Sequence, residues 1–165
     1  MRANILNLKD LSKVGNIFLA NICKAQKKIV PLQEKIMNTS NFSISVKKVT
    51  QSKLPNIDFS KLAFGHIFSD HMFVCDYKDG KWQNPRIEPY APFLVAPSMS
   101  VFHYGQAVFE GMKAYKDDKG DVFLFRPTEN YARMNKSCRR MAIPEFPEEL
   151  FDQGLKTLVT LDKDW

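Results

Sequence analysis

The sequence has few cysteines and histidines, and it has no long apolar run. Cys23, Cys75 and Cys138 are odd in number, widely spaced and not part of any C-x-x-C pair. This pattern speaks against a disulfide framework or a zinc site, and it favours a reducing, cytosol-like compartment. His66 and His71 are five residues apart, which places them on opposite faces of a strand, so we expect no metal site there. No uninterrupted apolar run reaches eighteen residues, so no segment is expected to span a membrane.

Most of the chain also lacks an excess of positive charge. The net charge is +6, but residues 1–36 carry seven basic groups against two acidic ones, which gives +5. The remaining 129 residues carry 17 basic and 16 acidic groups and are nearly neutral. A nucleic-acid-binding domain would concentrate its charge on a folded face. The sequence therefore does not predict a nucleic-acid partner.

Residues 1–36 differ from the rest in pattern as well as in charge. Residues 14–23 are apolar but are interrupted by glycine and asparagine, and no small-residue cleavage pattern follows, so they make a poor secretory signal. A single arginine among several lysines also fits a mitochondrial presequence poorly. Two interpretations stay open: translation begins at Met37, or the segment is a basic extension. We expect residues 1–53 to be a weakly structured extension and lead-in arm before a domain at 54–165.

Two strand pairs are expected in the body of the chain. The first is a strand over 64–77, a turn at Asp79-Gly80, and a return strand within 82–95 that three prolines confine to an edge or break. The second pairs residues 113–116 with 122–125 across another turn. A shorter edge strand is expected at Ser43-Ile44-Ser45-Val46.

Three helical segments accompany these hairpins. A short helix is expected from Met99 until Gly111 breaks it, and two longer helices are expected, one from Pro127 to a stop at Pro144 and one from Pro147. The elements predict an α+β fold of antiparallel hairpins with packed helices. The apolar stripe of the second helix is Tyr131, Met134, Cys138 and Met141, and that of the last helix is Leu150, Phe151, Leu155, Leu158 and Val159.

Four segments of the chain together resemble one family. They read F-G-H-I-F-S-D-H-M (64–72), H-Y-G-Q-A-V-F-E-G-M-K-A-Y (103–115), L-F-R-P-T-E-N-Y-A-R-M (124–134) and L-D-K-D-W (161–165). In this order and near these spacings, they are similar to segments of branched-chain amino-acid aminotransferases, the fold-type-IV enzymes that use pyridoxal 5'-phosphate. The resemblance covers about residues 54–165 and implies the small N-terminal domain of such an enzyme.

The resemblance also implies the residues of a site. It places the arginine that binds the cofactor phosphate at Arg133, although this side chain taken alone fits a solvated surface charge. A guanidinium suits the task because its planar fork can donate two hydrogen bonds to phosphate oxygens while staying charged. The aromatic residues of the substrate pocket fall on Phe64, Tyr104 and Phe109. In the family, the tyrosine matched by Tyr104 reaches across a dimer interface, so two subunits would complete each pocket.

The resemblance also implies that some functional residues of the family lie outside this chain. In the family, the lysine that binds the cofactor covalently lies in the large C-terminal domain, and Lys113 falls in a segment that is not that site. We therefore expect an N-terminal fragment, truncated before the large domain, with no catalytic residue and no activity alone. The complete cytoplasmic enzyme would exchange an amino group between Leu, Ile or Val and 2-oxoglutarate, as a homodimer or larger homo-oligomer.

Three alternatives remain open from the sequence. A D-amino-acid aminotransferase or an aminodeoxychorismate lyase would share the architecture, although the aromatic pocket residues and the F-E-G-M-K-A-Y run (109–115) speak against both. A non-catalytic fragment acting only through subunit association would expose a large apolar surface. A basic interaction module would require residues 1–36 to bind an acidic partner.

Overall fold

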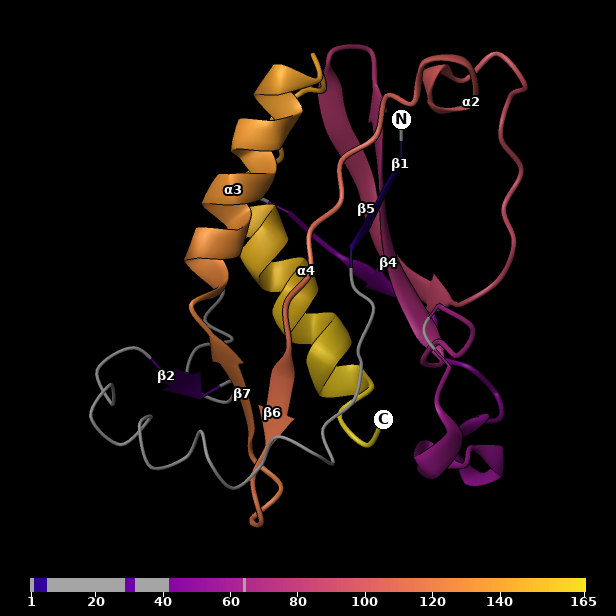
Figure 1. Ribbon diagram of the computed structural model, residues 1–165, viewed down its shortest axis with the longest axis vertical. Helices are drawn as coiled ribbons and strands as arrows, with labels where there is room; N and C mark the ends of the chain where they lie inside the picture. The colour runs from indigo at the N-terminus through magenta and orange to yellow at the C-terminus, as the bar shows by residue number, and fades with distance from the viewer. Residues whose placement is uncertain (1, 6–28, 32–41, 64) are drawn as a thin grey trace.

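The described part of the chain combines two small sheets with three α-helices. The structure is a computed structural model that describes residues 2–5, 29–31, 42–63 and 65–165, with side chains from residue 42 onward. Phe64 and the apolar stretch at 14–23 lie outside the described residues. Helix α4 lies between helix α3 on one side and the β4–β5 hairpin on the other (Figure 1). Among the described residues, no helix is both long enough and apolar enough to cross a membrane.

The first hairpin joins β4 (His71–Lys78) to β5 (Lys81–Pro89) in antiparallel register. Asp79 and Gly80 form its turn, with φ angles of 52° and 78°. Two consecutive positive φ angles suit the right-handed twist of a two-residue hairpin, and Asp-Gly tolerates them at low cost. The turn predicted from Asp79-Gly80 is confirmed.

The expected boundaries of this hairpin were wrong at both ends. The strand begins at His71 rather than at residue 64, so His66 lies outside it. Gly65 has a φ of 78° and belongs to a turn, which prevents an extended chain from starting there. The return strand ends at Pro89, and the next N–H, that of Tyr90, donates to the carbonyl of Asp70 at 2.8 Å.

Two short strands flank the hairpin in a sheet of order β1-β4-β5-β3. β1 (Arg2–Ile5) pairs antiparallel with β4. β3 (Ser45–Val46) pairs with β5 in parallel, so the expected edge strand is confirmed but the sheet is not purely antiparallel. A parallel pair is possible here because a long connection separates β3 from β5 in the chain.

The second sheet has the order β2-β7-β6 and is antiparallel throughout. β2 (Ile29–Pro31) pairs with β7 (Val122–Phe125), and β7 pairs with β6 (Ala114–Lys116). The pairing of 113–116 with 122–125 predicted from the sequence is thus confirmed. Val122 and Leu124 face the core, while Phe123 and Phe125 are more exposed.

The two long helices are α3 (Pro127–Arg140) and α4 (Glu148–Leu161). Pro127 opens α3 as expected, but the helix ends four residues before Pro144, at the turn through Met141. Met134 and Cys138 are buried, whereas Met141 is exposed, so the expected stripe of α3 is shorter than predicted. All five residues expected on the buried face of α4 are buried, namely Leu150, Phe151, Leu155, Leu158 and Val159.

The third helix, α2 (Ser100–Tyr104), is much shorter than the sequence indicated. It ends at Gly105, which adopts a left-handed conformation with φ of 59° and ψ of 28°, and not at Gly111. A left-handed glycine directly after the last helical residue is a common helix terminator. Residues 105–113 therefore run without regular structure to β6.

A buried polar network connects the start of β4 to the end of α4. Asp162 accepts hydrogen bonds from the backbone N–H of His71 at 3.0 Å and from its Nδ1 at 2.6 Å. Nε2 of the same ring accepts from the N–H of Val49 at 3.0 Å, so the ring proton sits on Nδ1. Asp70 accepts from Ser52, at 2.5 Å, and from the indole of Trp165, at 3.0 Å. The network attaches residues 47–53 to the folded body.

Candidate functional site

The candidate site is built on the irregular segment 105–113, which runs beside α3 (Figure 1). The side-chain amide of Gln106 donates to the carbonyl of Met141 at 2.9 Å, at the C-terminal end of the helix. Asn130, in the first half of α3, donates to the carbonyl of Gly111 at 2.9 Å. The segment is therefore fastened at two points along the helix despite having no regular hydrogen-bonding pattern of its own.

Glu110 and Arg133 form a bidentate ion pair between this segment and α3. Nε of Arg133 donates to Oε2 of Glu110 at 2.8 Å, and Nη2 donates to Oε1 in a second, very short bond. Oε1 also accepts from the amide of Asn130, at 2.9 Å, and from the backbone N–H of Gly111, at 3.1 Å. All four donors converge on one carboxylate, which fixes its position.

The two partners differ sharply in exposure. The Glu110 side chain is 6% exposed, whereas the Arg133 side chain is 67% exposed. The pKa of the Glu110 carboxyl lies below its usual value, chiefly because Arg133 donates to it; burial opposes this shift, and Asn130 and Gly111 reinforce it. The same pair raises the pKa of the Arg133 guanidinium. The carboxylate therefore stays ionised at neutral pH and keeps its hold on the arginine.

The geometry leaves the outer edge of the guanidinium available. An arginine offers five N–H donors in a planar fork, and Glu110 engages only the Nε–Nη2 side. In the described part of the chain, no acceptor is recorded for Nη1. The end-on pair of Nη1 and Nη2 can thus donate two parallel hydrogen bonds to an anion, an arrangement that matches phosphate or carboxylate. The donor set fits a phosphate group.

The two described aromatic candidates are conspicuously exposed. Tyr104, the last residue of α2, is 83% exposed, and Phe109 is 82% exposed. Phe109 directly precedes Glu110, so the chain itself holds it beside the ion pair. No hydrogen bond or ring contact joins Tyr104 to Phe109 or Arg133 within the described residues. Thus Phe109 and Arg133 belong to one locality, Tyr104 precedes the segment as the last residue of α2, and Phe64 is not described.

Sequence reasoning missed Glu110 and Asn130. The signal was present, because Asn130 and Arg133 share one polar stripe of α3 and Glu110 follows an aromatic residue in the F-E-G run. An acid placed beside apolar residues needs a partner, although Lys113 and Lys116 are closer to Glu110 in the sequence than Arg133 is. The sequence alone does not show which residues of segment 105–113 lie next to which residues of α3.

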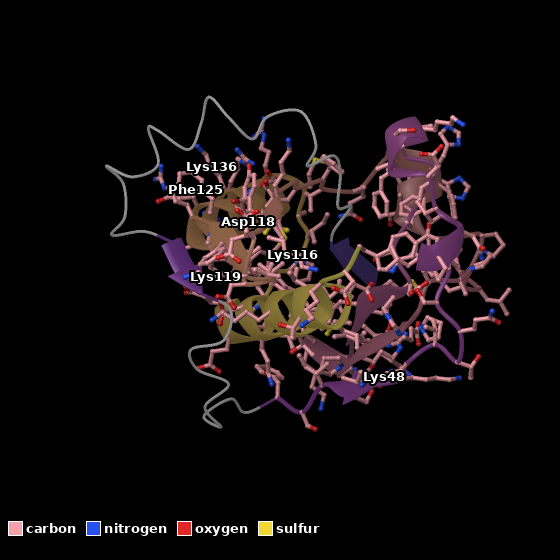
Figure 2. The ribbon with its side chains drawn as sticks, turned by 90° about the horizontal axis from the view of Figure 1, so that it is seen from below. Lys48, Lys116, Asp118, Lys119, Phe125 and Lys136 are labelled. Carbon is pink, nitrogen blue, oxygen red and sulfur yellow. The ribbon has the colours of Figure 1, made fainter. Side chains whose placement is uncertain are left out.

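The lysines labelled in Figure 2 are spread over different parts of the molecule. Lys48 follows β3, while Lys119 lies at the turn between β6 and β7, well away from it (Figure 2). Lys116 is paired with Asp164 at 2.7 Å. These side chains do not form a single basic face of the kind that binds a phosphate backbone.

Comparison with known proteins identifies the relatives of this chain. No protein-family model matches it. Branched-chain-amino-acid transaminase 1 of Bacillus subtilis is 58% identical over 109 residues, which are 66% of this chain and 31% of that protein. Branched-chain-amino-acid aminotransferase 2 of Bacillus subtilis is 50% identical over 119 residues, or 72% of this chain and 33% of the relative. The branched-chain-amino-acid aminotransferase of Mycolicibacterium smegmatis is 41% identical over 133 residues, which are 78% of this chain and 36% of that protein.

These matches confirm the resemblance seen in the sequence. The chain spans about a third of the length of the curated relatives it matches, and the matching part is their N-terminal portion. The identities are far above the level at which only the fold would be shared. Over about two thirds of its length or more, this chain is thus similar to the N-terminal portion of branched-chain-amino-acid aminotransferases.

Proposed function

We propose that this chain supplies the cofactor-phosphate grip and part of the substrate pocket of a branched-chain amino-acid aminotransferase. The observation that supports this most is the guanidinium of Arg133, which is held from behind by Glu110 and open to solvent at its outer edge. The cofactor in this proposal is pyridoxal 5'-phosphate, which the resemblance to the family implies. When bound, this cofactor acts as an electron sink for carbanion chemistry at the amino-acid Cα.

The role of this chain's residues is to bind, orient and exclude water. Arg133 holds the phosphate and so fixes the position of the cofactor ring. Phe64, Tyr104 and Phe109 form apolar walls that favour the side chains of Leu, Ile and Val, because burying such a chain is worth about 1.5–3 kcal/mol. The amino-group acceptor is 2-oxoglutarate, which becomes glutamate.

The proposal extends to the assembly and its domains. Residues 54–165 form a small domain of the fold-type-IV kind, preceded by an extension and arm at 1–53, and the working protein is a cytoplasmic homodimer or larger homo-oligomer. The exposure of Tyr104 and Phe109 supports this, because rings left in water gain stability once another surface covers them. In the dimer, Tyr104 would complete the pocket of the second subunit.

A chimeric enzyme tests the proposal. The matching N-terminal portion of the first Bacillus subtilis relative is replaced by this chain, and leucine transamination and cofactor retention after dialysis are measured. Arg133→Ala should lower the affinity for cofactor by roughly 10- to 100-fold, as expected for losing hydrogen bonds between charged groups. Arg139→Ala is the matched control, since Arg139 also lies on α3, is exposed and is paired with an acid, Glu145, at 2.7 Å.

The outcomes separate the competing enzymes. Activity with leucine, together with cofactor loss in Arg133→Ala alone, supports the proposal. Activity with D-alanine but not with leucine would instead indicate the D-amino-acid enzyme that shares the architecture. Equal cofactor retention in Arg133→Ala and Arg139→Ala would refute the assigned role of Arg133.

A further inference from the structure

We infer that Glu110 is the positioning residue of the anion site, fixing the guanidinium of Arg133 so that its outer edge faces the phosphate. This inference rests on the proposed function of Arg133 as the phosphate grip. It concerns a different residue, Glu110, and a different effect, namely the orientation of the Arg133 guanidinium before any ligand binds. Glu110 itself would not touch the ligand.

The contacts of Glu110 are those of a fixed support. Its carboxylate is almost fully buried and receives four donors, two from Arg133, one from Asn130 and one from the backbone of Gly111. The donors come from both the irregular segment and α3, so the carboxylate cannot shift without breaking contacts to both. Arg133, by contrast, is mostly in solvent and has no other recorded support for its guanidinium among the described residues.

A free arginine side chain would have to be ordered each time it binds an anion. Its rotamer freedom is among the largest of any side chain, and ordering it opposes binding. Glu110 has already imposed that order in the folded chain. The bidentate contact also selects which edge of the fork remains outward, and the remaining Nη1–Nη2 edge is the one that matches two phosphate oxygens. Preorganisation of this kind raises affinity without adding a ligand contact.

Glu110 also has an opposing electrostatic effect. A carboxylate behind the guanidinium offsets part of its positive charge and repels a phosphate. That repulsion acts at an exposed site, where water and salt screen it, whereas the orientation is imposed through direct hydrogen bonds. We therefore expect positioning to dominate, so that removing the charge of Glu110 weakens phosphate binding instead of strengthening it.

The test compares two ligands that differ only in the phosphate. Pyridoxine 5'-phosphate and pyridoxine lack the aldehyde, so neither reacts with lysines, and their dissociation constants for the full 165-residue chain are measured by calorimetry. The ratio of the two dissociation constants measures how much the phosphate group alone contributes to binding. Glu110→Gln keeps the shape of the side chain, and it should reduce the phosphate preference roughly fivefold while leaving pyridoxine binding unchanged. Glu145→Gln, which removes the acid paired with Arg139, should leave both constants unchanged.

The outcomes separate this inference from the proposed function. If Arg133→Ala abolishes the phosphate preference but Glu110→Gln keeps or increases it, Glu110 does not position the grip and the inference is overturned. If the unaltered chain shows no phosphate preference, or if Arg133→Ala retains it, the proposed role of Arg133 fails instead. An equal loss of affinity for both ligands in Glu110→Gln would indicate a general structural role and would also overturn the inference.

A measurement on the unaltered chain needs no variant to fold. The Nε–H of Arg133 donates to Glu110, whereas Arg139 is bound to Glu145 through Nη1, so only the former Nε–H should exchange slowly with water in side-chain NMR. Adding pyridoxine 5'-phosphate should leave this slow exchange in place, because the ligand binds the opposite edge. Loss of the protection on ligand binding would show that the anion displaces Glu110, contrary to the inference.

Discussion

The junction between β4 and α4 and the segment from α2 to β6 represent opposite ways of using side chains. At the junction, residues 71–75 are all buried, and His71 donates two hydrogen bonds to Asp162 inside the protein. Along the segment, Tyr104 and Phe109 are left in solvent and the backbone has no regular pattern. Of the candidate site residues, Tyr104 and Phe109 belong to the second region, and Arg133 contacts it from α3 through Glu110.

This difference indicates that one region mainly stabilises the fold and the other mainly presents exposed side chains. The junction holds β4 and the end of α4 together through buried side chains. In the segment, Val108 and Met112 are partly buried against the core, and side-chain contacts such as that between Glu110 and Arg133 fix it to α3. Exposed aromatic rings such as Tyr104 and Phe109 are typical of surfaces that another surface or a ligand covers. Substitutions in the two regions should therefore differ in whether they change stability or binding.

The largest loss of stability is expected from Asp162→Ala. It leaves the buried backbone N–H and Nδ1–H of His71 without acceptors, which should lower the free energy of unfolding by about 3 kcal/mol. Urea unfolding measures the change. Asp164→Ala is the matched control, since that aspartate makes an exposed ion pair with Lys116 and its loss should leave stability nearly unchanged. Equal effects of the two substitutions would contradict the importance of the buried network.

A smaller loss is expected from Gly154→Ala, in the middle of α4. A Cβ there would lie 2.7 Å from Cε2 of the buried Phe73 ring, so the ring or the helix must move. Overpacking of this kind should cost about 2 kcal/mol, against a gain of about 1 kcal/mol from helix propensity. Thr160→Ala, on the exposed side of the same helix, controls for propensity.

The clash explanation has its own check. Phe73→Leu should reduce the cost of Gly154→Ala when the two are combined, because the shorter side chain makes room for the methyl group. A Gly154→Ala variant that is more stable than the original chain would show that helix propensity wins and that the packing against β4 is looser than described.

Local patterns predicted the elements that depend on neighbouring residues. The Asp79-Gly80 turn, the start of α3 at Pro127 and the buried face of α4 all follow from spacing or from backbone preference, and the structure confirms them. The first strand begins later than the predicted residue 64 because the glycine at 65 turns the chain.

The features that the sequence did not predict depend on contacts between distant residues. His71 and Asp162 are 91 residues apart, and Glu110 and Arg133 are 23 apart, so no periodicity connects either pair. The end of α2 was misplaced because two glycines could terminate it, and only the backbone conformation shows that Gly105 does so. Arg133 was identified through resemblance alone; the residue that holds it became visible only in the structure.

A moderate and pH-dependent loss is expected from Asp70→Asn. Burial alone would raise the pKa of Asp70, but hydrogen bonds from Ser52, Lys53 and Trp165 outweigh it and lower the pKa below the usual 3.8. A carboxyl whose pKa is lower in the folded chain stabilises the fold above its unfolded pKa, and the stabilisation is lost as pH falls through the folded value. The substitution should therefore cost about 1–2 kcal/mol at neutral pH and less below pH 3.8.

Unfolding curves recorded from neutral to acidic pH measure this effect. Asp118→Asn is the control, because Asp118 lies in the exposed turn between β6 and β7 (Figure 2) and should leave the pH profile unchanged. A constant difference between Asp70→Asn and the original chain at every pH would show that the charge of Asp70 makes no contribution.

The smallest change in stability is expected where the proposed pocket residues lie. Replacing Tyr104 and Phe109 together by serine should alter the free energy of unfolding by no more than about 0.5 kcal/mol, because both rings are mostly in solvent. Tyr131→Ser is the contrasting control. The centroid of the Tyr131 ring lies 5.5 Å from that of the Phe151 ring, and losing this packing should cost about 1–2 kcal/mol. The double substitution should nevertheless remove much of the binding of an apolar dye. A loss of more than about 1 kcal/mol would mean that these rings already pack against the folded chain, and the contrast between the two regions would fail.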